Sequence, residues 1–145
     1  MVENKSEHAV RANDIFLAIK TAQEKAENPG MRLTDEQVAA VESEKSHPTL
    51  VIAGAGSGKT ELMAIRALWL VANRYAKPED ILGLTFTRKA AAELSKRILN
   101  GLTDQRATEY WPAELSEGYS NPLISTYNAY ANSLFRDNAL ALGYE

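Results

Sequence analysis

The residues with the clearest chemical potential form one glycine-rich loop in the middle of the chain. Its eight residues are Ala53-Gly54-Ala55-Gly56-Ser57-Gly58-Lys59-Thr60. They match the phosphate-loop (Walker A) pattern G-x-x-x-x-G-K-[ST] except at the first position, where alanine replaces glycine. Glycines allow successive backbone N–H groups to turn toward a phosphate, and the N-terminus of a following helix adds a positive dipole. We therefore expect residues 53–60 to bind the phosphates of a nucleotide cofactor.

Two side chains at the end of this loop would complete the nucleotide site. The Lys59 ammonium would pair with the β and γ phosphates of ATP, and the Thr60 hydroxyl would ligate Mg²⁺. Lys59 and Thr60 are therefore the candidate catalytic residues, and Thr60 is the candidate metal ligand. The plainer alternative is a glycine-rich turn with an incidental lysine. The strand expected before the loop and the helix expected after it argue against that alternative.

A phosphate-loop enzyme that hydrolyses ATP also needs an acid at the end of a second core strand. That acid holds Mg²⁺ and orders the attacking water. The strands expected at 81–87 and 123–126 end in Thr87 and Thr126, and Asp80 precedes its strand. We therefore expect the chain to bind nucleotide without hydrolysing it alone.

The elements that must position the loop alternate along the chain. Apolar runs bounded by helix breakers predict buried strands at 49–53 and 81–87, and a third short strand is expected at 123–126. Apolar periodicity and capping residues predict helices at 6–27, 34–41, 59–73, 88–102 and 127–142. Strands separated by helices are typical of βαβ units with a parallel sheet. The sequence therefore predicts an α/β fold, with flanking helices around the sheet and an N-terminal helix before it.

The composition limits the class of protein. The chain has 145 residues, 45% of them hydrophobic and 24% charged, and no cysteine. This length suits one domain with its own core. The absence of cysteine excludes a disulfide scaffold and a thiolate metal site, and it suits the cytosol. No apolar stretch approaches the ~20 residues of a membrane helix, and no signal peptide is visible. We expect a cytoplasmic protein that does not enter a membrane.

The charge is not that of a strongly basic nucleic-acid binder, because the net charge is −3. A local basic group nevertheless surrounds the single acid Glu93, and its members are Arg88, Lys89, Lys96 and Arg97. Such a stripe on a neutral body can contact phosphates. The commoner explanation for a run of this kind is a solvated helix face.

Three further segments, in order around the loop, resemble a known family. They are Leu33-Thr34-Asp35-Glu36-Gln37, Leu84-Thr85-Phe86-Thr87-Arg88-Lys89-Ala90-Ala91-Ala92-Glu93-Leu94 and Ser125-Thr126-Tyr127-Asn128-Ala129-Tyr130-Ala131. They resemble the Q motif, motif Ia and motif Ib of the UvrD/Rep/PcrA family of superfamily 1 DNA helicases. Glu61 and the sequence of residues 83–89 resemble the helicase–nuclease branch of that family in actinobacteria.

The resemblance covers Leu33 to about Gly143 and implies an incomplete RecA-like P-loop NTPase core. The chain would be the N-terminal part of motor domain 1A, with residues 1–30 as a helical extension and residues 31–145 as the partial ATP-binding domain. The resemblance implies an ATP-dependent DNA helicase that moves on single-stranded DNA in repair or recombination. Its partners would be single-stranded DNA and a second RecA-like domain.

On the nucleotide side, the resemblance implies that Gln37 reads the adenine edge through its amide. The alternative is a capping box, because Thr34 and Gln37 have the required spacing. The sequence leaves both roles open. Well-known members of the family carry an arginine after the loop that stacks on adenine, and Glu61 occupies that place here.

On the DNA side, the resemblance implies that Phe86 stacks on a base. The alternative is a core aromatic. The residues that would face DNA phosphates are Thr85, Thr87, Arg88 and Lys89. The alternative is that they form an ordinary helix N-cap with exposed basic side chains. Motif Ib would add Thr126, Tyr127 and Asn128. The family commonly has Phe-His where this chain has Tyr127-Asn128, so we expect a weaker phosphate contact there.

Two other classes of function remain open from the sequence. One is a P-loop kinase, which would need arginines in a lid after the core. Residues 103–122 contain a single arginine, Arg106, which disfavours a kinase. The other is a nucleotide-binding interaction module that does not hydrolyse ATP. Salt-dependent binding to single-stranded DNA would separate a helicase domain from both.

Overall fold

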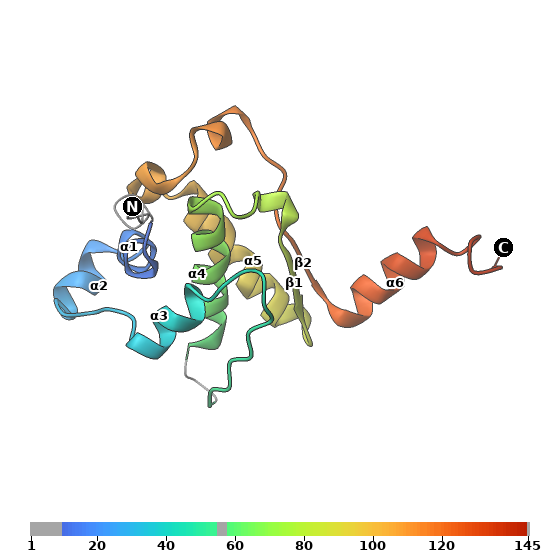
Figure 1. Cartoon of the computed structure of the whole chain (residues 1–145), viewed down its shortest axis with the longest axis horizontal. Coiled ribbons are helices and arrows are strands. Elements are labelled where there is room, and N and C mark those ends of the chain that lie inside the picture. The colour runs from blue at the N-terminus through green and yellow to red at the C-terminus, as the bar shows by residue number, and fades with distance from the viewer. Residues whose placement is uncertain (1–9, 55–57, 145) are drawn as a thin grey trace, which may run out of the picture.

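The computed structural model describes residues 10–54 and 58–144 (Figure 1). The α-helices in this part of the chain are α1 (Ala12–Ala18), α2 (Ala22–Glu27), α3 (Asp35–Val41), α4 (Lys59–Ala72), α5 (Arg88–Thr103) and α6 (Tyr127–Asp137). The strands are β1 (Leu82–Thr85) and β2 (Leu123–Thr126), and the short 3₁₀ helices are η1 (Pro78–Asp80), η2 (Gln105–Tyr110) and η3 (Ala113–Glu117). Ala55, Gly56 and Ser57 of the predicted loop lie outside the described residues.

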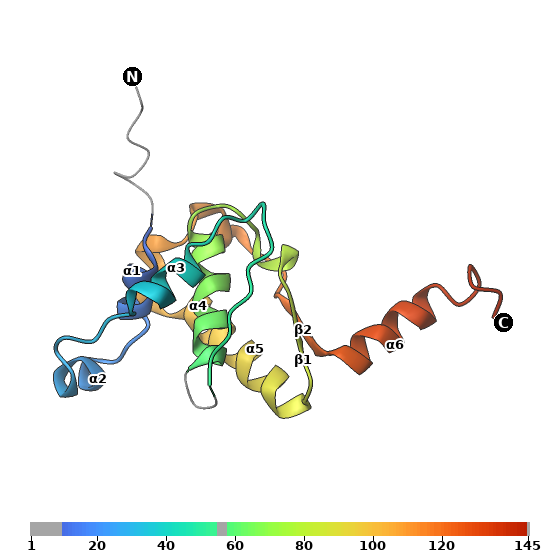
Figure 2. The same ribbon diagram turned by 60° about the horizontal axis from the view of Figure 1, so that its bottom comes forward.

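The core is built around helix α4. This helix packs against α5 on one side, and α1 and α3 cover it on another (Figures 1 and 2). Its buried residues include Ile65, Leu68 and Val71, which recur at helical spacing and form one apolar face. Gly101 of α5 allows a close approach, because a Cβ at that position would collide with the buried Leu68 side chain. The helix that follows the predicted loop is therefore anchored in the core.

The sheet consists of β1 and β2 in the described residues, and the two strands are parallel. Their register pairs Leu82 with Leu123 and Thr85 with Thr126. Helix α5 follows β1, packs on this sheet and leads back through η2 and η3 to β2, as expected for a βαβ unit. Helix α6 begins where β2 ends and extends away from the body (Figures 1 and 2). The prediction of an α/β fold with a parallel sheet and flanking helices is thus confirmed in this coarse form.

The predicted buried strand at 49–53 is wrong. These residues form no strand, and Leu50 and Ile52 are 84% and 87% exposed. A strand exists only when a neighbour pairs with its backbone, and within the described residues β1 and β2 pair with each other. An apolar run bounded by breakers indicates an extended segment, but it cannot supply the partner.

The predicted helix at 6–27 is also wrong as a single element, and residues 6–9 of it lie outside the described part. Helices α1 and α2 are separate because Thr21 caps a new helix. Its hydroxyl accepts a hydrogen bond from the Glu24 N–H (3.1 Å), and the Glu24 carboxylate accepts one from the Thr21 N–H (2.7 Å). This reciprocal capping box restarts the helix at Ala22.

Other boundaries follow the predictions closely, with two exceptions. The helix expected at 34–41, the helix at 59–73 and the strand at 123–126 are confirmed within one residue. The strand expected at 81–87 is shorter and only half-buried, because Thr87 already caps α5. The helix expected to reach residue 142 ends at Asp137. No helix of the described residues is long and apolar enough to span a membrane.

Candidate nucleotide and DNA sites

The predicted phosphate loop joins the extended segment at 49–53 to the first turn of α4. Gly58 is the N-cap of α4 and has a left-handed φ of +78°, a conformation that glycine adopts at little cost. The Lys59 ammonium donates a hydrogen bond to the Ala53 carbonyl (3.0 Å). This bond joins the seventh residue of the predicted loop to its first, so the loop ends are held together.

The described residues of the loop fit a magnesium nucleotide. A Cβ at Gly54 or Gly58 would meet no atom within 4 Å, so there is open space on the Cβ side of both residues. Lys59 is exposed, and Thr60 lies beside it at the N-terminus of a 14-residue helix, where phosphates are stabilised. In the described part of the chain no three His, Cys, Asp or Glu residues gather as metal ligands. A Mg²⁺ here would therefore be held by phosphate oxygens and the Thr60 hydroxyl.

Gln37 forms the capping box at the start of α3. Its backbone N–H donates to the Thr34 hydroxyl (3.2 Å), and its side-chain oxygen accepts from the Thr34 N–H (2.8 Å). One of the two alternatives for Gln37 is therefore present in the structure. The side-chain NH₂ group takes no part in this box, so a donor contact to adenine is compatible with it. The adenine role stays a prediction.

Glu61 lies in the first turn of α4 and forms an ion pair with Lys20, which lies between α1 and α2. The sequence indicated no function for the N-terminal segment. Lys20 and Glu61 are 41 residues apart, and no motif connects them. Only the packing of α1 on α4 in the folded chain brings these two side chains together.

The predicted DNA-facing residues from two separate motifs meet at one edge of the sheet. Because β1 and β2 are parallel and in register, Thr85 and Thr126 end their strands side by side. The next residue in each segment is aromatic, and the rings of Phe86 and Tyr127 lie 5.1 Å apart with an interplanar angle of 36°. Phe86 is 89% exposed, so the alternative of a core aromatic is wrong for this chain.

Two helices begin at the same edge. The Thr87 hydroxyl accepts from the Ala90 N–H (3.1 Å), and the Thr126 hydroxyl accepts from the Ala129 N–H (3.1 Å). The N-cap alternative is thus present for Thr87, and Thr126 caps α6 in the same way. The positive N-termini of these two helices and the exposed side chains of Arg88, Lys89 and Asn128 nevertheless lie at this edge. Arg97 pairs with Glu93 one turn along α5 (3.0 Å), which is an ordinary solvated pair.

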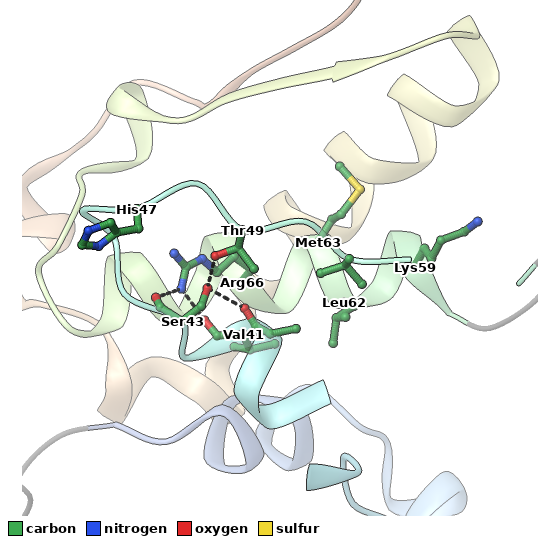
Figure 3. A pocket seen from close by; sticks show the side chains of 10 residues that line it. Val41, Ser43, His47, Thr49, Lys59, Leu62, Met63 and Arg66 are labelled. Carbon is green, nitrogen blue, oxygen red and sulfur yellow. Dashed lines mark hydrogen bonds between the residues drawn. The ribbon is translucent and has the colours of Figure 1, made fainter. Parts of the chain in front are cut away.

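A cavity of about 340 Å³ lies between α3, α4 and the extended segment (Figure 3). Val51, Leu62 and Met63 line its apolar part, and Lys59 lies at one end with its ammonium directed away from the other labelled side chains. Among the described residues, the cavity shares only Lys59 with the predicted phosphate site.

Arg66 crosses the other end of this cavity and fastens α3 to α4 (Figure 3). Its guanidinium donates to the backbone carbonyls of Val41 and Ser43, each at 2.6 Å. Val41 is the last residue of α3 and Ser43 lies two residues beyond it, where carbonyls have no helical partner. Partial burial lowers the pKa of Arg66 from its usual value. Arg66 thereby holds the Q-motif helix against the helix that follows the loop.

We expect Arg66→Met to lower the free energy of unfolding by roughly 1.5–3 kcal/mol, the usual contribution of a hydrogen bond from a charged group. Urea denaturation followed by circular dichroism measures this. The matched control is Arg97→Met, which breaks the exposed pair with Glu93 and should cost at most about 0.5 kcal/mol. Equal losses in the two variants would contradict the role given to Arg66.

Comparison with known proteins identifies relatives along most of the chain. It is 33% identical over 131 residues to the ATP-dependent DNA helicase UvrD1 of Mycobacterium leprae, which covers 88% of this chain and 15% of that protein. It is 33% identical over 113 residues to a probable DNA helicase II homolog of Mycoplasma capricolum subsp. capricolum (78% and 14%). It is 52% identical over 62 residues to DNA helicase IV of Escherichia coli (43% and 9%).

The chain thus spans 15% or less of the length of these relatives. A protein family described as the UvrD/REP helicase N-terminal domain matches residues 33–145. The match begins at Leu33, so it includes the loop and both strands and leaves α1 and α2 outside. The resemblance read from the four motifs is therefore confirmed. Because the match extends over most of its residues, this chain belongs to the UvrD/REP helicase N-terminal domain family.

Proposed function

We propose that this chain is the ATP-binding part of an ATP-dependent DNA helicase with a RecA-like P-loop core. The observation that carries the proposal is the placement of Lys59. Its ammonium reaches back to the Ala53 carbonyl (3.0 Å) at the N-terminus of α4, within the residues that match the helicase family. A second RecA-like domain would cover the nucleotide from the other side.

In this proposal Lys59, Thr60 and Gln37 each have a defined task. Lys59 exchanges the Ala53 carbonyl for the β and γ phosphates of ATP, and the α4 N-terminus stabilises their negative charge. The Thr60 hydroxyl would ligate the Mg²⁺ that accompanies the nucleotide, and a bound Mg²⁺ would supply neutralisation of the phosphate charge there. Gln37 donates from its amide to the adenine while its oxygen keeps the capping box intact.

The edge that carries Phe86 and Tyr127 is the proposed track for single-stranded DNA. An exposed aromatic ring presents the same π-face to every base, which suits a motor that moves without reading sequence. Arg88 and Lys89 lie at the beginning of α5, where they and the helix N-terminus attract DNA phosphates. Cycles of ATP binding and hydrolysis would open and close the cleft between two domains and move the strand along this edge. We place the whole protein in the cytoplasm, in repair or recombination.

We expect Lys59→Ala to weaken binding of a fluorescent ATP analogue with Mg²⁺ by at least about tenfold, because charge-assisted contacts to phosphate contribute ~1.5–3 kcal/mol each. A fluorescence titration of the 145-residue chain measures this. The matched control is Lys77→Ala, an exposed lysine beyond the opposite end of α4. Equal affinities for wild type and Lys59→Ala would remove the loop from the nucleotide site.

A titration with labelled oligothymidylate separates the helicase from the other classes. A helicase domain should bind the single strand more weakly as salt is raised, because phosphate contacts release counterions. Nucleotide binding without any such DNA binding would instead indicate a nucleotide-binding module or a kinase.

A further inference from the structure

The N-terminal segment reaches the predicted nucleotide site through one side chain. Lys20 lies between α1 and α2, before the residues that match the family, and its ammonium pairs with the Glu61 carboxylate in the first turn of α4. The Lys20 and Glu61 side chains are only 15% and 30% exposed. A charge pair with limited access to solvent is screened less by salt than one on the open surface.

The structure holds Lys20 in place from several sides. Its ammonium lies 4.9 Å from the centre of the Phe16 ring. Its carbonyl accepts a hydrogen bond from the Arg106 guanidinium (2.7 Å), which also reaches the Ile19 carbonyl (3.3 Å). Asp104 in turn fixes Arg106 through a 2.9 Å hydrogen bond. The backbone at Lys20 is therefore fixed by Arg106, and its ammonium lies between the Phe16 ring and the carboxylates of Glu61 and Glu24 (3.8 Å to Glu24).

Glu61 is in an unusual position for a nucleotide site. It is two residues beyond Lys59, so its carboxylate lies within the first helical turn after the residues proposed to bind phosphate. A negative charge so close to a triphosphate would oppose binding, although it interacts favourably with the helix N-terminus. Lys20 supplies an opposite charge at the same place.

We propose that Lys20 is a positioning residue of the nucleotide site, which neutralises Glu61 and so permits a triphosphate to bind at the start of α4. This inference rests on the proposed function, because it requires nucleotide at the loop. It assigns the N-terminal segment a task in nucleotide affinity. The competing role is a purely mechanical one, in which the ion pair only ties α1 and α2 to the body.

The charge role and the tether role predict opposite changes in nucleotide affinity for the single variant at Glu61. If charge matters, Lys20→Met leaves Glu61 uncompensated and weakens binding of a fluorescent ATP analogue by roughly 3- to 20-fold, as expected for repulsion between charges that are not in direct contact. Glu61→Gln removes that negative charge, leaves Lys20 facing Glu24 (3.8 Å), and strengthens binding. The double variant Lys20→Met/Glu61→Gln returns to within about twofold of wild type. If the pair is only a tether, both single variants weaken binding alike.

The experiment is a titration of wild type and these three variants with the analogue and Mg²⁺, at low salt and at about 0.5 M added salt. The expected result is weaker binding for Lys20→Met, tighter binding for Glu61→Gln, and a difference that shrinks at high salt. Weakening in both single variants, or equal affinities in all four chains, overturns the proposal. If Lys20→Met does not fold, Glu61→Gln alone distinguishes the two roles, because its nucleotide affinity rises in one and falls in the other.

Two controls isolate the cause. Arg11→Met breaks another ion pair between the N-terminal segment and the body, to Glu42 (2.8 Å), and should leave nucleotide affinity unchanged. Lys59→Ala tests the proposed function itself. If Lys59→Ala binds like wild type, the nucleotide site is wrong. If Lys59→Ala loses binding while the Lys20 and Glu61 variants do not differ in sign, only the present inference fails.

Discussion

The 145-residue chain alone should release no more phosphate from ATP than its Lys59→Ala variant, with or without single-stranded DNA. The strands that could present a catalytic acid, β1 and β2, end in Thr85 and Thr126. Neither residue can hold Mg²⁺ as a carboxylate or order an attacking water. A second domain would also have to supply the arginine that stabilises the transferred phosphoryl group, a contribution of ~10³–10⁵ in rate where it was measured in phosphate-loop enzymes.

A phosphate-release assay at saturating nucleotide measures this difference. The positive control is the full-length helicase proposed above, in which DNA should stimulate hydrolysis and Lys59→Ala should abolish it. Hydrolysis by the short chain that disappears in Lys59→Ala would contradict the prediction. It would mean that an acid elsewhere in this chain holds the metal.

The second large effect concerns Phe86. We expect Phe86→Ala to weaken binding of labelled oligothymidylate by roughly 5- to 150-fold, since a stacked base contributes ~1–3 kcal/mol. The melting temperature should change little, because Phe86 is 89% exposed and a large loss of stability arises from buried rings. Nucleotide affinity should also be retained. Fluorescence anisotropy and thermal unfolding of the same samples measure all three.

Phe135→Ala is the matched control, because Phe135 is also an exposed aromatic but lies near the far end of α6 and contacts Tyr144. It should leave DNA affinity close to wild type. Equal DNA affinity for Phe86→Ala and wild type would remove Phe86 from the DNA track. A large fall in melting temperature with DNA affinity retained would make its contact with Tyr127 structural.

Features that depend on neighbours a few residues apart could be predicted from the sequence. The helix that begins after Thr34, the helix after the loop and the strand at Leu123–Thr126 are in their expected places. Two of these boundaries have caps in which a threonine hydroxyl accepts a hydrogen bond from the backbone N–H three residues on, Thr34 at the start of α3 and Thr126 at the end of β2, whereas the helix after the loop begins at Gly58. The capping box at Thr21 and Glu24 belongs to the same class, so the break between α1 and α2 was readable from the Thr-x-x-Glu spacing.

The family was likewise determined by the sequence, because motif order and residue type require no coordinates. The candidate site was predicted residue by residue on the same basis. What those residues do in nucleotide and DNA binding stays a prediction, to be tested by the variants at Lys59 and Phe86.

Only the tertiary structure decided which distant residues meet. The extended segment at 49–53 has the composition of a strand, yet pairing needs a neighbour, and the described strands pair with each other instead. Phe86 meets Tyr127 because two parallel strands end in register. Lys20 meets Glu61 because α1 packs on α4. Contacts of this kind depend on how elements far apart in the chain pack together, and no local sequence pattern predicts that packing.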